Sequence, residues 1–347
     1  MSPSPPRPTL ADRLQAQWLT GGALSAALLP LSWIYRGLLA LRALAYRLGI
    51  RRAETLPVPV IVVGNWIVGG AGKTPTTLAL LALLRARGLQ VGVVSRGYGR
   101  AGDEIRLVDR TSSAREVGDE PLLIHLRSGA PVAVGRDRVE AARAVLTAHP
   151  ELHCLISDDG LQHWRLPRGL SLLVFDERGL GNGRLLPAGP LRQPPRPLQP
   201  DQLVIYNAPR PSTALPGFVA ERRLAGAVSL AEWWTGHPAR MEQLLALRDE
   251  PGLVAAAGVA RPQRFFGMLQ DLGLRFTALP LPDHAGFETL PWPDDTRTVV
   301  LTEKDAVKLP PDRVGSVAVW VVALDFSAGA AFEAALDAQL QKLSLRP

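Results

Sequence analysis

Cysteine is nearly absent from this sequence of 347 residues: Cys154 stands alone, in the apolar run HCLIS. A single cysteine excludes a disulfide framework within the chain and suits a reducing cytoplasm. We interpret Cys154 as a small buried hydrophobe, which is the common environment of a free cysteine. Zinc-finger spacings and aromatic–basic repeats are missing as well, so we expect no nucleic-acid partner.

Acidic residues are fewer than basic ones, with 32 Asp and Glu against 39 Lys and Arg, and the formal net charge is +7. The basic excess is spread over many arginines and fits an anionic partner: a nucleotide, a phosphorylated substrate or an anionic membrane surface. Apolar residues make up 47% of the chain and charged residues 20%, which predicts a sizeable core rather than global disorder. No pattern indicates an obligate protein partner.

Charge is missing altogether from Leu14 to Tyr35. A run of about 20 apolar residues can span a bilayer, but glycines, polar residues and Pro30 interrupt this one. Arginines follow it and aromatic residues lie nearby, a combination typical of a segment that lies on an anionic leaflet. A transmembrane span and an ordinary buried helix are the alternatives. A secretory signal is disfavoured, because the phosphate-binding motif described below requires cytoplasmic ATP.

Short apolar strands alternate with helical patterns along the rest of the chain. We predict strands within residues 57–65, 89–95, 153–160, 170–176, 201–207, 252–260, 274–281, 296–305 and 316–326, and helices over 74–88 and 328–343. Continuous apolar strands separated by helices indicate an α/β fold with mostly parallel sheets, and ligands then gather at the carboxyl ends of the strands.

A proline-rich stretch, residues 181–200, cannot be regular structure and separates two sets of alternating strands and helices. We therefore predict a boundary near residue 210. The expected parts are an N-terminal membrane-associated helical segment (1–55), a nucleotide-binding domain of the P-loop NTPase type (56–210) and a smaller α/β domain (211–347).

The stretch VGNWIVGGAGKTP, residues 63–75, meets the phosphate-loop pattern G-x-x-x-x-G-K-[ST] at its end but has Ile67 in place of the first glycine. It is a phosphate loop that lost a residue, a chance match or the loop of a particular family. Backbone N–H groups of such a loop bind phosphate, its lysine reaches the outer phosphates and its hydroxyl reaches Mg²⁺. We expect ATP to contact Ile67, Val68, Gly69, Gly70, Ala71, Gly72, Lys73 and Thr74, and Thr74 to contact Mg²⁺.

Acidic residues in two other motifs are candidates for metal binding or catalysis. Asp158 and Asp159 end an apolar strand in LISDDG, where an aspartate of a phosphate-loop enzyme holds Mg²⁺, although turn residues are the alternative. In GDEPLLIHLRSG, Asp119 on its own is interpreted as a helix N-cap, with Glu120 in the first turn. His284, in LPDHAGF, is on its own a polar surface residue.

The motif LTEKD, residues 301–305, invites comparison with the guanine-reading N/T-K-x-D of GTPases. Its lysine stands one place too late for that pattern. We therefore do not predict GTP as the nucleotide.

Together these stretches resemble the lipid A 4′-kinase family, the tetraacyldisaccharide 4′-kinases. The resemblance covers most of the chain in order: an apolar N-terminus, VGNWIVGGAGKTP, SRGYGR, GDEPLL, DDGLQHWRL, LLPAGPLR, DHAGF and LTEKDAVK. The family's loop has the form V-G-N-x-T-V-G-G-x-G-K-T-P and also lacks the first glycine. Ile67 replaces the usual threonine, which removes one hydroxyl near the phosphates.

The resemblance implies ATP-dependent phosphorylation of the 4′-hydroxyl of tetraacyldisaccharide 1-phosphate, yielding lipid IVA and ADP. It also implies two α/β/α domains that close over the site, and a peripheral or monotopic location on the cytoplasmic face of the bacterial inner membrane. By motif, Lys73 contacts phosphate, Asp119 is the catalytic base and His284 is its partner. The metal set is Thr74, Glu120, Asp158 and Asp159. Candidates for the substrate phosphate are Arg96, Arg100, Arg184 and Arg192, each weighed against a solvent-exposed arginine.

Two other functions are weighed against the kinase. A phosphate-loop ATPase of the positioning type also has a loop reading GG-x-GKT, but its signature lysine before the glycine pair is Val68 here. A membrane-bound nucleotide-binding module without chemistry is the second. Neither accounts for Asp119, His284 and the proline-rich stretch together.

Overall fold

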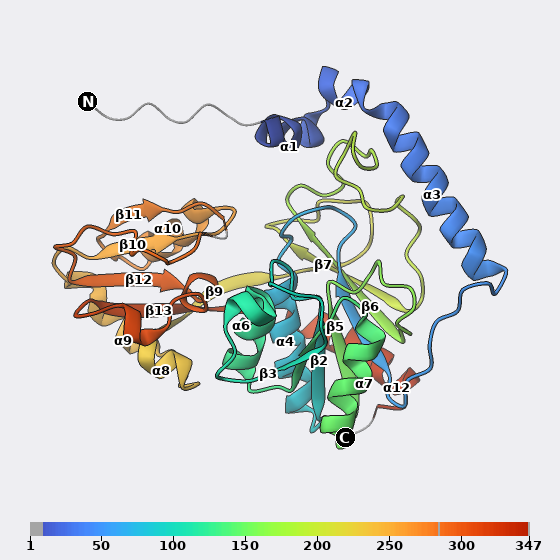
Figure 1. Cartoon of the computed structure of the whole chain (residues 1–347). Coiled ribbons are helices and arrows are strands. Elements are labelled where there is room, and N and C mark those ends of the chain that lie inside the picture. The colour runs from blue at the N-terminus through green and yellow to red at the C-terminus, as the bar shows by residue number, and fades with distance from the viewer. Residues whose placement is uncertain (1–9, 284, 346–347) are drawn as a thin grey trace.

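The computed structural model describes residues 10–283 and 285–345, so His284 lies outside the described residues. The chain begins with three helices, α1 (Leu10–Thr20), α2 (Ala23–Ala27) and α3 (Leu29–Arg47), which run along one side of the molecule (Figure 1). Two β-sheets with their helices follow. None of the helices in the described part of the chain is both long enough and apolar enough to cross a membrane.

The first sheet has eight strands in the order β3-β4-β2-β5-β1-β6-β7-β8. Their bounds are β1 Val60–Gly64, β2 Val91–Ser95, β3 Arg106–Val108, β4 Val132–Val134, β5 Cys154–Asp158, β6 Leu170–Asp176, β7 Gln202–Asn207 and β8 Phe218–Val219. Neighbouring strands are parallel, except that β3 is antiparallel to β4 at one edge. In the centre β1 pairs with β5, and Val63 lies opposite Asp158.

Helices cover both faces of this sheet. The helices are α4 (Lys73–Ala86), α5 (Ala114–Val117), α6 (Asp119–Ser128) and α7 (Arg138–Ala148). Successive residues of a strand point to opposite faces: Ile61 and Val63 of β1 share a core with α4 and α6, and Val60 and Val62 share another with α7. Burial on both faces explains why the strands are continuous apolar runs rather than alternating ones.

The second sheet has the strand order β11-β10-β12-β13-β9. Its strands are β9 Glu221–Ser229, β10 Val254–Ala257, β11 Thr277–Pro280, β12 Thr298–Thr302 and β13 Ala318–Ser327. Its helices are α8 Leu230–Trp234, α9 Met241–Ala246, η1 Leu247–Asp249, α10 Pro262–Asp271, α11 Glu303–Ala306 and η2 Pro311–Arg313. All neighbours are parallel except β9, which is antiparallel to β13.

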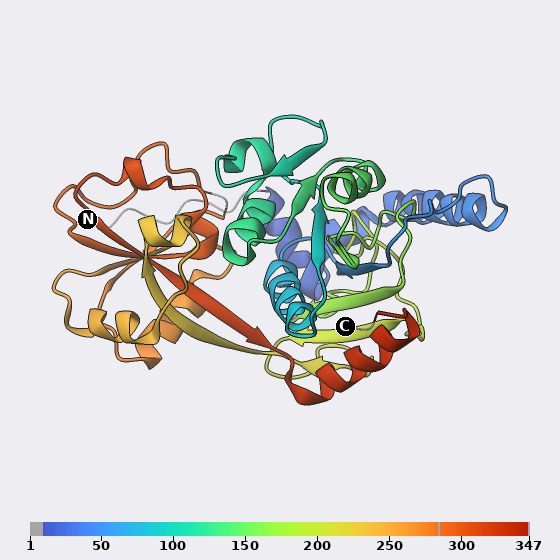
Figure 2. The same cartoon turned by 90° about the horizontal axis from the view of Figure 1, so that it is seen from below.

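Strands β9 and β13 also connect the two sheets, as Figure 2 shows from below. After β13 the chain enters α12 (Gly329–Lys342), which returns to the first sheet. Phe332 packs edge-on against Phe218 of β8 with ring centroids 5.6 Å apart, and Asp337 forms an ion pair with Arg87 at 2.5 Å. The last helix therefore packs with the first unit. The predicted boundary near residue 210 stays a prediction.

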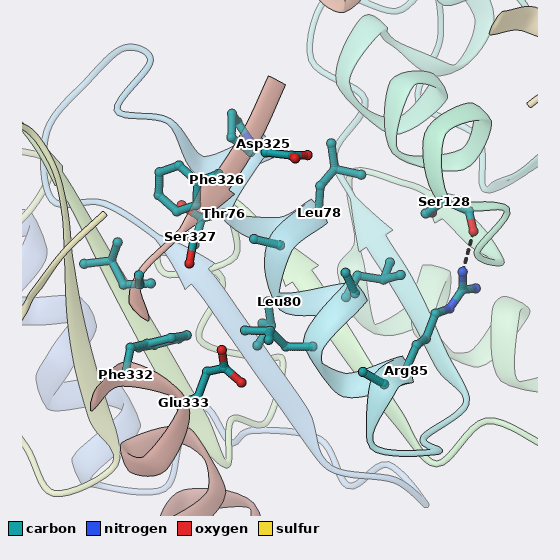
Figure 3. A pocket seen from close by; sticks show the side chains of 18 of the residues that line it. Thr76, Leu78, Leu80, Arg85, Ser128, Asp325, Phe326, Ser327, Phe332 and Glu333 are labelled. Carbon is teal, nitrogen blue, oxygen red and sulfur yellow. Dashed lines mark hydrogen bonds between the residues drawn. The ribbon is translucent and has the colours of Figure 1, made fainter. Parts of the chain in front are cut away.

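The chain crossing between the sheets leaves a mostly apolar cavity of about 640 Å³. Leu78 and Leu80 of α4 line it on one side, and Phe326 of β13 and Phe332 of α12 on the other (Figure 3). None of the residues from 65 to 74 is among its lining residues. The cavity thus belongs to the connection between the sheets and not to the glycine-rich loop.

The sequence patterns predicted most of the inner strands. The α/β class with mostly parallel sheets is confirmed, as are the predicted helices that became α4 and α12. The proline-rich stretch 181–200 contains no helix or strand, only isolated bridges at Leu185 and Leu191. The antiparallel strands β3 and β9 were not predicted.

Candidate functional site

The glycine-rich loop and the acidic pair meet because β1 and β5 are parallel neighbours. The loop leaves the carboxyl end of β1 and enters α4, and Asp159 directly follows the carboxyl end of β5. Carboxyl ends of adjacent parallel strands lie at the same edge of a sheet. Lys73 and Thr74 form the first turn of α4, and both are buried at this edge.

The end of the loop requires glycine at position 72. Gly72 has a φ of 89°, and a Cβ atom there would stand 1.9 Å from Nδ2 of Asn207 and 2.8 Å from Nη2 of Arg222. Asn207 itself donates a hydrogen bond to the carbonyl of Ala71 at 2.9 Å. The loop is thus fitted against side chains from β7 and β9, far away in sequence.

The start of the loop is part of the core. Ile67, at the place of the missing first glycine, is fully buried and forms an isolated bridge with Leu191. The N–H of Val68 donates to the carbonyl of Pro190 at 2.9 Å. Arg178 donates to the carbonyls of Val68 and Gly70. Nucleotide contacts of Ile67 and Val68 stay predictions, and here both residues anchor the loop to the proline-rich stretch.

Lys73 reaches back over the loop. Its Nζ lies 3.5 Å from Oδ1 of Asn65 and from the carbonyl of Gly69, and 3.8 Å from Oδ1 of Asp159. Only 8% of its side chain is exposed. The ammonium group is therefore held between the loop and the acidic pair.

The two adjacent aspartates have opposite electrostatic environments. Burial raises the pKa of Asp158 to about 7, and the neighbouring Glu120 carboxylate adds to this increase. Thr77 donates to its Oδ1 at 2.8 Å, whereas Oδ2 has no hydrogen-bond partner. Burial also acts to raise the pKa of Asp159, but Lys73 and Arg192 outweigh it and hold the pKa below its ordinary value.

The start of α6 corrects one prediction. The helix begins at Asp119 and its N-cap is Gly118, so the interpretation of Asp119 as the N-cap is wrong. Gly118 has a φ of 93°, and a Cβ there would meet Cα of Gly97 at 2.9 Å. This close approach packs the SRGYGR loop onto the start of α6. Asp119 and Glu120 lie in the first turn, where the helix dipole favours negative charge.

The four candidate arginines have different surroundings. Arg192 donates to both carboxylate oxygens of Asp159, at 2.9 and 3.0 Å. Arg96 is exposed, Arg100 donates to the carbonyl of Glu104, and Arg184 donates to Oγ of Ser25 at 3.2 Å. Arg192 is thus the one of the four that the structure brings to the acidic pair.

Three further arginines near the site were missed. Arg138 is buried at the start of α7, and burial lowers its pKa to about 10 although Asp159 and Asp158 act in the other direction. Burial likewise lowers the pKa of Arg222 to about 10, and Arg178 holds the loop carbonyls. Arg138 could have been suspected, because its helix follows the carboxyl end of another parallel strand, β4. No local sequence pattern indicates that Arg222 lies near the site.

The N-terminal helices hold the proline-rich stretch through side-chain hydrogen bonds. Trp18 donates to the carbonyl of Pro187 at 2.9 Å, Ser32 to that of Leu185 at 2.8 Å and Tyr35 to that of Arg192 at 2.8 Å. The donors lie on α1 and α3. Since Arg192 also binds Asp159, these helices are linked to the acidic pair through a single residue.

Large apolar side chains of α3 are exposed. Leu31, Trp33, Ile34, Leu38 and Leu41 are between 52% and 67% exposed. Beside the helix lies a cavity of about 590 Å³. Its lining includes Arg36, Trp66, Trp164, Arg168, Gln193 and Arg196. Such a cavity has both the charge for an anion and the aromatic surface for an apolar group.

The acidic pair fits a hydrated magnesium ion better than an all-protein metal site. Within residues 10–283 and 285–345, no group of three or more His, Cys, Asp or Glu side chains is arranged to hold a metal ion. Magnesium usually takes one or two carboxylates and completes its shell with phosphate oxygens and water. The buried, unpartnered Oδ2 of Asp158 suits this role, and the Thr74 hydroxyl lies on the helix that Asp158 contacts.

The raised pKa of Asp158 predicts how stability depends on pH. The folded protein keeps a proton up to about pH 7 that the unfolded chain, with a pKa of 3.8, has already released. The folded state therefore loses stability relative to the unfolded chain as pH rises from about 4 to 7. Asp158→Asn removes this dependence and keeps an acceptor for Thr77. We expect its stability advantage over the unmodified protein to grow from pH 4 to 7 and then level off.

Thermal unfolding followed between pH 4.5 and 8.5 measures this difference. Asp312→Asn, at an exposed position, is the matched control and should track the unmodified protein. An Asp158→Asn difference that stays constant across this range contradicts the assignment of the shift to Asp158.

Comparisons with known proteins agree with the sequence motifs. A crystal structure described as the apo form of LpxK from Aquifex aeolicus in complex with ATP superposes with a TM-score of 0.78 at 27% identity, covering 92% of this chain and 99% of that one. The tetraacyldisaccharide 4′-kinase of Leptothrix cholodnii is 54% identical over 336 residues, 95% of this chain and 96% of that protein. The protein of the same name from Methylibium petroleiphilum is 53% identical over 356 residues, 100% of this chain and 99% of that protein.

The family model described as tetraacyldisaccharide-1-P 4′-kinase matches residues 24–341. The match includes the glycine-rich loop, the acidic pair, the start of α6 and both sheets. This chain therefore belongs to the tetraacyldisaccharide-1-phosphate 4′-kinase family.

Proposed function

We propose that this protein transfers the γ-phosphate of ATP to the 4′-hydroxyl of tetraacyldisaccharide 1-phosphate, releasing ADP and lipid IVA. Membership of the family supports the reaction. One observation assigns this reaction to a particular site. The glycine-rich loop at the end of β1 lies beside Asp158 and Asp159 at the end of β5.

The nucleotide is bound by the loop from Ile67 to Thr74, which acts as a phosphate loop. Lys73 neutralises charge on the transferred phosphate, and the N-terminus of α4 favours anions. Asp158, Asp159, Glu120 and the Thr74 hydroxyl would hold Mg²⁺, which offsets phosphate charge when bound. Residues 56–210 form the nucleotide-binding domain in this proposal, and the smaller unit formed from residues 211–347, with α12 packed back on the first sheet, closes over it.

Asp119 acts as the general base and His284 as its partner. As the sugar oxygen attacks the γ-phosphorus, Asp119 accepts the hydroxyl proton, and the bond from the γ-phosphorus to the bridging oxygen of ADP breaks. A partner contributed by the second unit would orient the base only when both substrates are enclosed, which would suppress hydrolysis of ATP. The position of Asp119 in the first turn of a helix, beside Glu120, supports this role.

Lys73→Ala tests the site assignment directly. We expect kcat/KM for phosphoryl transfer to fall by at least about tenfold, because charge stabilisation is the main contribution of such a site. The assay uses radiolabelled ATP and purified disaccharide 1-phosphate in detergent micelles. Lys342→Ala, on exposed α12 surface, is the control. A Lys73→Ala protein with nearly full activity would remove the phosphate-loop assignment.

Asp119 and His284 should behave as one unit in a double-mutant cycle. Asp119→Asn and His284→Ala should each lower kcat by about 10²–10⁴, the range of general-base catalysis, with ATP affinity kept. Because His284 acts through Asp119, the second substitution should cost little once the first is present. Strictly multiplicative losses, or a fully active Asp119→Asn protein, contradict the pair.

The apolar face of α3 supports a peripheral or monotopic attachment to the cytoplasmic face of the inner membrane. Trp33 and Leu41 are 67% and 64% exposed, and Arg36, Arg42 and Arg47 lie on the same helix. Exposed apolar residues on a helix with arginines match the pattern of interfacial helices on anionic lipids. The neighbouring cavity at Trp66 and Arg168 is suited to part of the lipid acceptor, with its anionic and apolar groups.

Replacing part of this face tests the attachment. In Trp33→Gln/Leu38→Gln/Leu41→Gln, affinity for vesicles with anionic lipid should fall at least about tenfold, because each side chain loses apolar burial. ATP affinity should be unchanged. The matched control is Ile105→Gln/Leu107→Gln, which alters exposed apolar residues on the first sheet's edge. Equal flotation of both variants with liposomes is the result that refutes the membrane face.

A further inference from the structure

The segment LTEKDAVK, residues 301–308, lies outside the proposed nucleotide, metal and proton-transfer residues. It leaves β12 and forms the short helix α11. Thr302 is the N-cap, and its hydroxyl donates to Oδ2 of Asp305 at 2.7 Å. Asp305 is fully buried and also accepts a hydrogen bond from the N–H of Gly258 at 2.9 Å. The segment is therefore fixed rigidly to the end of the neighbouring strand β10.

Two lysines of this segment hold the loop that follows β11. Nζ of Lys304 binds Oδ1 of Asp283 at 2.8 Å, and Nζ of Lys308 donates to the carbonyl of Ala285 at 2.7 Å. Asp283 and Ala285 are the chain neighbours of His284 on either side. The loop is thus held through the side chain of the residue immediately before that histidine and through the backbone of the residue immediately after it.

Lys308 is built into the fold rather than exposed. Only 8% of its side chain is accessible, and its ammonium group also lies 3.2 Å from Oδ1 of Asp305 and 5.5 Å from the ring centre of Phe287. One compact ammonium thereby joins a carbonyl, a carboxylate and an aromatic face, a geometry that a planar guanidinium does not reproduce. The chain has only four lysines, and two of them are in this segment.

The same segment is tied to the helix that carries Asp119. Oε1 of Glu303 accepts from Nη1 of Arg127 at 2.5 Å and from Nε1 of Trp233 at 3.2 Å. Its other oxygen accepts from the N–H of Leu324 at 3.3 Å. Arg127 lies in the last turn of α6, and Asp119 lies in the first. A rigid helix of 10 residues thus joins the Glu303 contact to Asp119.

We propose that residues 302–308 form a positioning element that sets the loop bearing His284 against the helix bearing Asp119. Lys304 and Lys308 hold the loop, and Glu303 holds α6 through Arg127. The inference rests on the proposed function, because it requires that Asp119 and His284 work together. Displacing a catalytic group by about 1 Å can cost up to about 100-fold in rate, so contacts on both neighbours of His284 have a direct effect on turnover.

Lys304→Met and Lys308→Met test this element in the full-length protein. We expect each to lower kcat between about tenfold and 100-fold through misplacement of the loop, with ATP affinity unchanged. The matched control is Lys342→Met, at a lysine on α12 that contacts only Gln339 of the same helix in the described part of the chain. Lys304→Met keeps the test decisive if loss of the buried Lys308 prevents folding, because the Lys304–Asp283 pair is partly exposed.

The discriminating measurement repeats both substitutions in a His284→Ala background. A positioning role predicts no further loss of kcat there, whereas a general destabilisation of the fold predicts the same loss in both backgrounds. Wild-type kcat in the lysine variants, or losses that multiply with His284→Ala, overturns the inference while the proposed base pair stands. A His284→Ala protein with full activity is the separate result that removes the base pair, and the positioning element with it.

Discussion

The parallel pairing of β1 with β5 is the constraint on which the candidate site depends. With Val63 opposite Asp158, the strand that leads into the glycine-rich loop ends beside the strand that leads into the acidic pair. A slip of one residue would turn the side chains of β5 to the other face of the sheet. The packing of both strands between α4 and α7 prevents such a slip, because their side chains are fully buried on both faces. The packing that stabilises the core therefore also fixes the position of the glycine-rich loop relative to the acidic pair.

Charge balance is the second requirement at this edge. Carboxylates gathered out of water are tolerated only with compensating charge or with retained protons. Asp159 forms ion pairs with Lys73 and Arg192, and its pKa falls. At Asp158, burial and the Glu120 carboxylate outweigh Thr77 and Lys73, and the pKa rises to about 7. The two adjacent aspartates therefore differ in their contacts. Asp159 joins an ion-pair network, whereas Oδ2 of Asp158 is buried and has no hydrogen-bond partner in the described part of the protein.

Local patterns in the sequence predicted the inner strands, α4 and the glycine-rich loop, since each depends on residues that are close together in the chain. Long-range contacts explain what was missed or wrong. Asn207 and Arg222 fit against Gly72 from β7 and β9, and no local pattern indicates that contact. The N-cap interpretation of Asp119 failed because Gly118, packed on Gly97, takes that place. The roles of Asp119 and His284 came from resemblance to a family and not from their own surroundings.

The hydrogen bonds of the N-terminal helices have a consequence for the order in which the chain acquires its structure. Trp18, Ser32 and Tyr35 bind carbonyls that lie between 153 and 169 residues further along. At a translation rate of about 5–20 residues per second, these helices wait roughly 8 to 34 seconds for their partners. During that interval the three donors lack the carbonyls that they bind in the folded protein, so the N-terminal helices cannot yet dock. The N-terminal helices and the proline-rich stretch, which carries Arg192 beside Asp159, therefore acquire their shared structure only after strands β1 to β6 have been synthesised.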